Sequence, residues 1–188
     1  APKAAAPAAG PPQRGGVTVI AIDSDPETLN LGTTTSNTSG DVGAKILEGL
    51  VYLDPTMTPQ GELATSWEIS PDGKTYTFTL RPNVTWHDGK PFTSADVKFT
   101  FDEILAKFHP RTQSLMKQRV ESVEAPDPLK VVIKLKEPFA PFLTQMTVFD
   151  APILPKHLYE GTDILKNDYN LKPVGTGPFK FSEWARGS

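Results

Sequence analysis

The chain has 188 residues, with 19 basic and 22 acidic side chains and a formal net charge of −3. This length is typical of one domain, or of one lobe of a larger protein. The acidic balance gives general binding to nucleic acid no electrostatic support, and no apolar run approaches the ~20 residues that cross a membrane. The absence of cysteine excludes disulfide bonds, cysteine zinc sites and thiol nucleophiles.

Residues 1–16 are rich in Ala, Pro and Gly and contain no apolar stretch of the kind that forms the core of a signal peptide. We therefore expect a flexible tail. It is either the mature N-terminus left after cleavage of a signal or a tether that has lost its lipid anchor. Both interpretations predict a periplasmic or other extracytoplasmic location. The alternative is an artificial linker.

The next part of the chain combines a β-branched run, a polar segment and an amphipathic pattern. Residues 17–22 have the composition of a buried strand. Residues 30–40 are rich in Thr, Ser and Asn, and apolar residues then recur at helical spacing. This spacing predicts a helix over residues 41–52, with Asp41 near its start, where a carboxylate suits the helix dipole.

The clearest local signal is a turn followed by a strictly alternating run. Residues 71–74 have the composition of a tight turn, in which Gly73 can adopt a positive φ angle. Residues 75–81 then alternate between threonines on one side and apolar residues on the other, namely Tyr76, Phe78 and Leu80. This alternation predicts a half-buried strand entered from a β-hairpin.

Thr93 and Asp96 have the spacing of a capping box and predict the start of a helix. The apolar face of this helix is formed by Val97, Phe101, Ile104 and Leu105. Further along, the pattern predicts a second hairpin, two short helices and a final strand, at residues 120–135, 138–146, 155–159 and 179–184. The irregular order of strands and helices indicates a mixed α+β fold rather than a doubly wound parallel sheet.

Several short motifs follow one another over almost the whole chain after the tail. They are Leu63-Ala64-Thr65-Ser66-Trp67, Trp86-His87-Asp88-Gly89, Leu154-Pro155-Lys156-His157 and Gly175-Thr176-Gly177-Pro178-Phe179. A single motif of this length is weak evidence, but the order and spacing of the set are specific. In these motifs the sequence closely resembles the extracytoplasmic solute-binding proteins of peptide/nickel ABC transporters, family 5.

The resemblance implies a periplasmic-binding-protein-like fold, in which two lobes close over a ligand and the first lobe carries an inserted mixed α/β subdomain. It divides the chain into a flexible tail (1–16), a first-lobe strand with a cleft loop (17–40), the inserted subdomain (41–172) and a strand that returns to the first lobe (173–188). The second lobe and the remainder of the first are missing from this sequence. We therefore expect a truncated chain with a partial first lobe.

Two polar loops are expected to lie near the ligand. The first is formed by Ser36, Asn37, Thr38 and Ser39. Its amides and hydroxyls suit a carboxylate or a peptide carbonyl. The second contains Phe149 and Asp150, which the resemblance places near the cleft; the ring would pack on a ligand side chain and the carboxylate would pair with an ammonium group. The alternatives are that the first loop only caps a helix, and that the second supplies a buried ring and a capping carboxylate.

Other conspicuous residues are expected to be structural. The aromatic side chains predicted to lie in the subdomain core are Trp67, Trp86, Phe92 and Phe101. The segment 175–177 lacks the Gly-Lys-Ser/Thr of a phosphate loop and is predicted to be a turn. His87 and Asp88 resemble a catalytic dyad but belong to a turn, and His109 and His157 lack metal-ligand spacing. We therefore expect no catalytic residue, no metal ligand and no cofactor.

The function that the resemblance implies is that of a monomeric solute-binding component of an ABC importer, not an enzyme. It would capture a short peptide, or a related solute such as a nickel complex, an opine or an oligosaccharide, and deliver it to the permease subunits. The membrane would be contacted only through the permease or a lost N-terminal anchor. The alternatives are a stand-alone interaction domain and, with less support, a hydrolase; the sequence contains no Gly-x-Ser-x-Gly, His-Glu-x-x-His or Walker motif.

Overall fold

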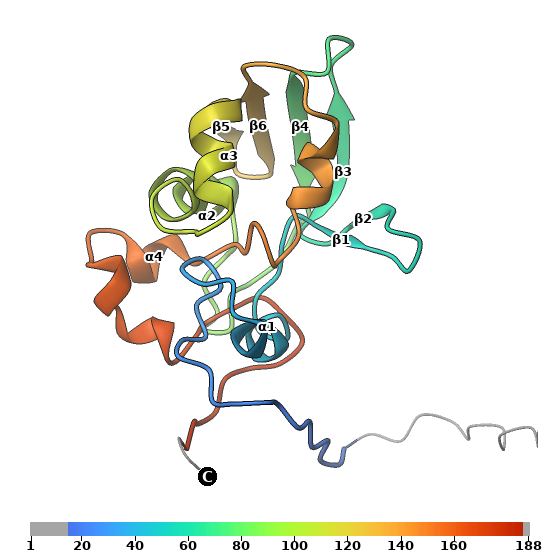
Figure 1. The fold of residues 1–188 in the computed structure, drawn as a ribbon. Helices are drawn as coiled ribbons and strands as arrows, with labels where there is room; N and C mark the ends of the chain where they lie inside the picture. The colour runs from blue at the N-terminus through green and yellow to red at the C-terminus, as the bar shows by residue number, and fades with distance from the viewer. Residues whose placement is uncertain (1–14, 186–188) are drawn as a thin grey trace, which may run out of the picture.

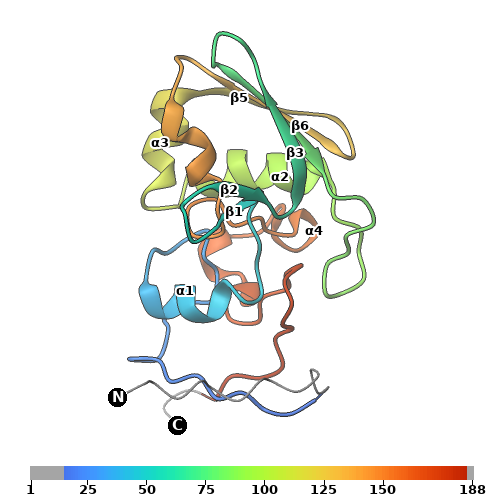
Figure 2. The ribbon, with the colours of Figure 1, turned by 90° about the vertical axis from the view of Figure 1, so that its right-hand side faces the viewer.

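The computed structural model describes residues 15–185, and Figure 1 shows that they form an upper and a lower region. The upper region contains a four-stranded sheet with helices packed against it. The lower region contains α1 (Asn37–Gly43) and the two ends of the described chain, which both run along its lower edge (Figures 1 and 2). Within residues 15–185, no helix combines the length and the apolar character needed to cross a membrane.

The sheet contains four strands with antiparallel pairing throughout. Their order is β3 (Ala64–Ile69), β4 (Thr75–Leu80), β6 (Lys130–Leu135) and β5 (Val120–Asp127). The first predicted hairpin is confirmed, and Gly73 in its turn has a φ angle of +69°. The second hairpin is also confirmed, although β5 continues through two positions that were expected to belong to its turn.

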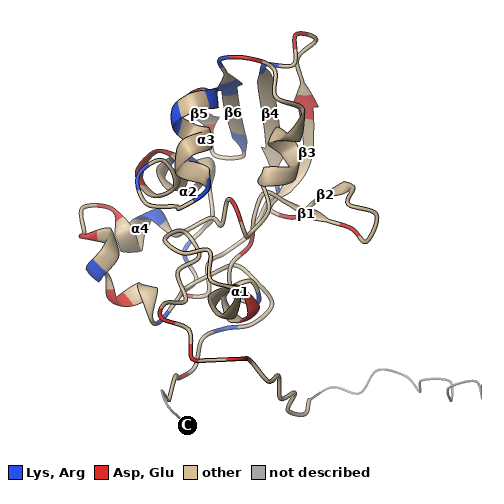
Figure 3. Ribbon diagram, in the orientation of Figure 1, with Lys and Arg blue, Asp and Glu red and all other residues tan. Residues whose placement is uncertain are grey.

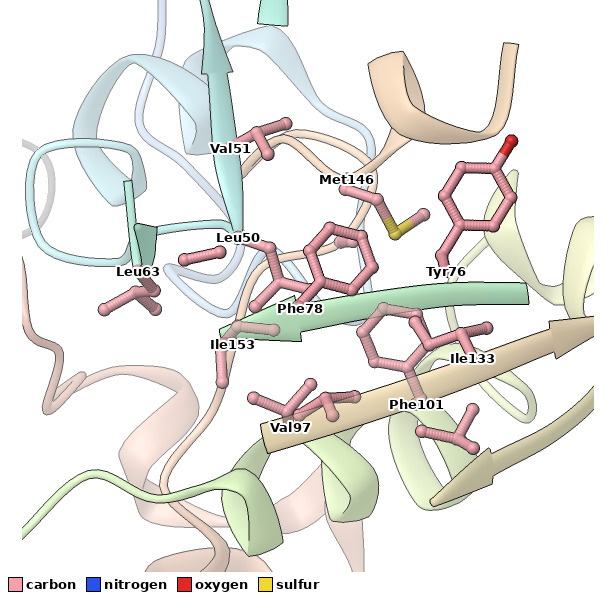
Figure 4. Close-up of a cluster of buried hydrophobic side chains, with 14 of the residues drawn as sticks. Leu50, Val51, Leu63, Tyr76, Phe78, Val97, Phe101, Ile133, Met146 and Ile153 are labelled. Atoms are coloured by element: carbon pink, nitrogen blue, oxygen red, sulfur yellow. The ribbon is translucent and has the colours of Figure 1, made fainter. Parts of the chain in front are cut away.

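The main hydrophobic core lies between this sheet and the helices that cover it. On β4, Tyr76, Phe78 and Leu80 are at most 3% exposed, as the alternation predicts. Figure 4 shows Phe78 among buried side chains from other elements, including Val97 and Phe101.

Helix α2 (Ser94–Phe99) starts at the predicted capping box and continues as a π-helix, η1 (Thr100–Leu105). The capping box is confirmed, because Asp96 accepts a hydrogen bond from the backbone N–H of Thr93, at 2.9 Å, and Thr93 faces the N–H of Asp96. The core prediction for the aromatic residues is confirmed as well. Trp86 and Phe92 are buried edge to face, with ring centroids 5.9 Å apart, and Trp67 is partly buried against the same cluster.

The remaining elements are short and are divided between the two regions. A two-stranded hairpin, β1 (Val51–Leu53) and β2 (Pro59–Gly61), projects to one side of the molecule in Figure 1. The others are α3 (Thr112–Arg119), the 3-10 helix η2 (Ala140–Gln145), α4 (Lys156–Tyr159), η3 (Ile164–Lys166) and η4 (Asp168–Asn170). Helices at residues 138–146 and 155–159 were expected, and both are present in shorter form.

A second apolar cluster joins the regions below the sheet. Its buried members are Leu31, Leu47, Phe99, Ile104, Leu154, Tyr159 and Ile164. Beside it, Asn30 is fully buried and donates from its side-chain amide to the side-chain oxygen of Asn170, at 2.7 Å. The backbone N–H of Leu29 bonds to the carbonyl of Asn170, at 2.8 Å. These contacts fix the polar segment before α1 against a distant part of the chain.

The two predicted terminal strands are wrong for this structure. Residues 17–22 form no strand, and Val17 and Val19 are 92% and 88% exposed. Residues 179–184 form no strand either, and both segments line a cavity of about 620 Å³ beside α1. A strand is stable only when a neighbour satisfies its backbone, and neither segment has a paired strand among the described residues. Residues 1–14 of the predicted tail, and residues 186–188, lie outside the described part of the chain.

The predicted helix over residues 41–52 is also wrong in its limits. Helix α1 begins four residues earlier and ends at Gly43, so Asp41 lies in its second half. The later apolar residues are held by a distant segment instead, because the N–H groups of Leu50 and Val51 both donate to the carbonyl of Met146, at 3.0 and 3.2 Å. Two glycines within α1 weaken its intrinsic helix preference further.

We expect Phe78→Ala to lower the free energy of unfolding by about 3–5 kcal/mol, because the lost burial and the remaining cavity both destabilise the core. Thr79→Ala, at the exposed neighbouring position of β4, is the matched control and is expected to cost less than about 1 kcal/mol. Urea-induced unfolding followed by tryptophan fluorescence measures both changes. Equal unfolding midpoints for the two variants would contradict the assignment of this core.

Candidate functional site

The first candidate loop forms the beginning of α1 rather than a segment in front of it. Ser36 is the N-cap residue, and Asn37, Thr38 and Ser39 occupy the first turn. Ser36 and Asn37 are exposed and Thr38 is partly buried, with its hydroxyl 3.3 Å from the hydroxyl of Ser24. Ser39 is fully buried. Three of the four predicted residues are therefore accessible to a ligand.

The cap itself is weak, which bears on the alternative that this loop serves only the helix. The side chain of Ser36 makes no capping hydrogen bond, and the first turn contains no acidic residue. The first N–H groups of any helix lack partners within the helix and need acceptors from elsewhere. The beginning of α1 therefore presents donors and small hydroxyls that the cap does not use.

The second candidate loop lies directly against the first. Phe149 is 52% exposed, so the alternative of a buried ring is wrong. A Cβ atom placed on Gly40 would lie 3.1 Å from Cε1 of Phe149, which means that the ring rests on the backbone of α1. Two loops that are far apart in the sequence thus form one surface, with an aromatic face beside accessible polar groups.

Asp150, the other residue of this loop, already has a charged neighbour. Its carboxylate lies 3.4 Å from Nε of Arg111. Its backbone carbonyl accepts a hydrogen bond from the hydroxyl of Thr112. The sequence did not indicate Arg111 as part of the site, because nothing local in the sequence shows that residues 111 and 150 meet.

The Phe149 loop is positioned by a close backbone crossing at Gly49. A Cβ atom on Gly49 would lie 2.6 Å from the backbone of Thr147 and Val148, so only glycine permits this approach. After the loop, Ile153 donates its N–H to the carbonyl of Glu48, at 2.9 Å. Both ends of the loop are therefore tied to the segment that leads into β1.

The Glu62 side chain completes this crossing and titrates abnormally. Its carboxylate accepts a hydrogen bond from the N–H of Gly49, at 2.9 Å. Burial, with a smaller contribution from the nearby charge of Glu48, raises the pKa of Glu62 to about 7, although the Gly49 N–H and Arg81 act in the opposite direction. The carboxyl group is therefore held partly protonated near neutral pH.

The raised pKa of Glu62 makes stability depend on pH. In the folded state the pKa of Glu62 is about 7, whereas the ordinary pKa of a glutamate side chain is 4.5. The folded state thus binds more protons over this interval, and the free energy of unfolding is expected to fall as the pH rises through it. Glu62→Gln retains an acceptor for Gly49 but cannot ionise, and is expected to remove about 1–3 kcal/mol of the decline.

The measurement is the free energy of unfolding at pH 5 and pH 8 for the parent chain and the Glu62→Gln variant. Glu68→Gln, which removes a carboxylate from an exposed position of β3, is the matched control and should leave the decline intact. A parent chain that is equally stable at both values would refute the abnormal titration.

The histidines have structural contacts that the sequence did not predict. Nε2 of His87 lies 2.8 Å from the carbonyl of Gly177, and its Nδ1 lies 3.3 Å from the N–H of Gly175. Both ring nitrogens therefore face the 175–177 turn, and the dyad with the adjacent Asp88 does not form. Asp88 instead pairs with His157, at 2.7 Å.

The pKa of Asp88 and the distribution of possible metal ligands also bear on what these residues can do. Partial burial opposes the charge of Asp88, but hydrogen bonds from His157 and from the N–H of Lys90 outweigh it and hold the pKa of the Asp88 carboxyl below its usual value. Over residues 15–185, no three His, Asp or Glu side chains are grouped in a way that could hold a metal ion.

Comparison with known proteins identifies the class to which this fold and surface belong. The model of the bacterial extracellular solute-binding proteins, family 5, matches residues 58–188. The chain therefore belongs to the family 5 bacterial extracellular solute-binding proteins, as the motifs predict. The proteins of this family that it resembles are binding proteins.

Particular relatives agree with this assignment. A putative ABC transporter peptide-binding protein of Brucella abortus is 44% identical over 142 residues, which are 72% of this chain and 26% of the relative. The solved structure of the oligopeptide-binding protein AppA from Bacillus subtilis with a nonapeptide matches 87% of this chain and 33% of its own, with a TM-score of 0.79 and 30% identity.

A third match is DppA of Helicobacter pylori, a periplasmic binding protein solved with the peptide STSA. The match covers 87% of this chain and 36% of the DppA chain, with a TM-score of 0.75 and 31% identity. The predicted α+β, periplasmic-binding-protein-like fold is thus confirmed. The chain spans between about a quarter and just over a third of the length of these relatives.

Proposed function

We propose that this chain is part of the solute-binding component of an ABC importer that captures short peptides outside the cytoplasm. The observation that carries the proposal is the surface on which the half-exposed ring of Phe149 rests on Gly40 beside the accessible polar start of α1. An apolar platform next to backbone donors suits a peptide, which presents side chains and carbonyl groups in alternation. The names of the relatives support the same class of ligand.

The residues proposed to contact the solute are Phe149, Ser36, Asn37 and Thr38. The ring would cover an apolar side chain of the peptide, while the hydroxyls and N–H groups at the start of α1 would donate to its carbonyl oxygens. Ser39 lies below this surface and would act through packing. Asp150 faces Arg111, so an ammonium group of the solute would have to share it with that guanidinium.

Because the chain spans only part of its relatives' length, we propose that a second lobe closes over this surface in the whole protein. Hinge closure would remove the ligand from water and present a surface to the permease. The protein would act as a monomer, without catalysis. Binding by this chain alone is then expected to be at least about tenfold weaker than binding by the whole protein, because one wall of the site buries only part of the ligand.

We expect Phe149→Ala in the whole protein to weaken binding of the peptide Ser-Thr-Ser-Ala, or of a more apolar tetrapeptide, about tenfold, because an aromatic contact of this kind dominates a small interface. Leu165→Ala, which truncates a 62% exposed apolar residue on η3, is the control and should leave affinity unchanged. Isothermal titration calorimetry measures both. Unchanged affinity for Phe149→Ala would remove this surface from the site.

Absence of peptide binding by the whole protein would overturn the proposed ligand class. A stand-alone interaction domain would then be the better description, provided that a stable protein partner was recovered with the same preparation.

A further inference from the structure

A second hollow lies next to the proposed peptide surface and has a different chemical character. This hollow of about 370 Å³ is lined by residues of α3, of η2 with its N-cap, and of the Phe149 loop. In Figure 1, α3 lies at the β5 side of the sheet and the orange helix η2 at the β3 side. Its lining residues include Arg111, Leu115, Gln118, Arg119, Phe139 and Asp150. Four of them lie on α3 or at its N-cap, at spacings of four, three and one residues, so they share one face of the helix.

The two arginines in this cavity have donors to spare. Arg111 reaches Asp150 through Nε alone, at 3.4 Å, and Arg119 reaches Glu137 through one Nη atom, also at 3.4 Å. Three lysine pairs among the described residues are shorter, for example 2.6 Å for Lys98 with Asp102. A guanidinium carries five N–H donors in a planar fork, and one long contact leaves most of them available.

The wall that faces the arginines is apolar and belongs to elements packed on the main core. The guanidinium of Arg119 lies 5.1 Å from the ring centroid of Phe139, which orients the charged group across the cavity. Phe142, on the same 3-10 helix, is fully buried and packs on Tyr76 at a centroid distance of 4.7 Å. The hollow is therefore formed by elements that are fixed to the main core.

Charge and shape together define the group that would fit. The lining contains two arginines against one aspartate, an apolar floor of Leu115 and Phe139, and the side-chain amides of two glutamines. Figure 3 shows basic positions on α3 in blue. The volume lies within the range of small-ligand sites, roughly 300–1,000 Å³. A planar, bidentate acceptor attached to an apolar group matches these walls, and a carboxylate is such an acceptor.

We propose that this cavity is a subsite for a carboxylate of the bound solute, held between Arg111 and Arg119; the inference rests on the proposed peptide-binding function. Asp150 belongs to its wall and Phe149 to the adjoining surface, so a peptide lying on Phe149 has a carboxylate within reach of the subsite. The carboxylate is either the C-terminus of the peptide or the side chain of an acidic residue.

The experiment measures peptide affinity for the whole protein by calorimetry, with probes that differ only in the carboxylate. The first pair is Ser-Thr-Ser-Ala as the free acid and as the C-terminal amide. The second pair is the amides of Ser-Glu-Ser-Ala and Ser-Gln-Ser-Ala. We expect the acid of at least one pair to bind about tenfold more tightly than its neutral partner, and the pair that discriminates identifies the source of the carboxylate.

Variants assign this preference to the two arginines. Arg111→Gln and Arg119→Gln are each expected to remove most of the discrimination, while Lys166→Gln, which removes a positive charge from an 84% exposed side chain, should preserve it. Arg119→Lys keeps the charge and the packing on Phe139 but loses the planar fork, and is expected to retain only part of the preference.

The outcomes separate the two proposals. Peptides that bind without any preference for the carboxylate would overturn the subsite and leave the peptide-binding function standing. A preference that survives both glutamine variants would also overturn it, because other residues would then hold the carboxylate. No binding by any of the four probes would overturn the proposed function and the subsite together. The comparison between acid and amide needs no variant, so a missing preference overturns the subsite even if an arginine variant fails to fold. Arg119→Lys, which keeps the charge, then tests the assignment to the arginines.

Discussion

The arrangement of this molecule depends on the backbone crossing at Gly49. The carbonyl of Met146 accepts hydrogen bonds from two consecutive N–H groups, those of Leu50 and Val51. Because Gly49 has no side chain, its backbone can lie directly against the backbone of residues 147–148. Figure 4 shows Leu50 and Met146 next to Phe78, and Val51 belongs to the same buried cluster, so the crossing is also packed into the main core. It sets where the Phe149 loop emerges, and hence where its ring meets α1.

The crossing also explains which features the sequence could predict. The hairpin through Gly73 and the capping box at Thr93 follow from residues a few positions apart, whose periodicity and side-chain chemistry suffice. The helix expected at residues 41–52 shows the opposite case. Its apolar spacing is real, but Leu50 and Val51 donate their N–H groups to the carbonyl of Met146, almost a hundred positions away. No local sequence pattern predicts a hydrogen bond over that separation.

The same reasoning applies to the terminal segments and to the site. Residues 17–22 have strand composition, but composition does not supply a neighbouring strand. Phe149 and the start of α1 were expected near one cleft only through family resemblance, and the structure brings them into contact through Gly40. Arg111 and the pair formed by Asp88 and His157 carried no local signal, because each depends on a contact made by the tertiary fold.

The turn held by His87 has a consequence for the modular character of the protein. Gly177 donates its N–H to the carbonyl of Ile46, at 2.9 Å, and a Cβ atom on Gly175 would collide with that same oxygen. Residues 46 and 177 are therefore neighbours in space, so the segment between them begins and ends at adjoining points. When the two ends of a segment lie close together, changes in its length or sequence have little effect on the geometry of the rest of the protein.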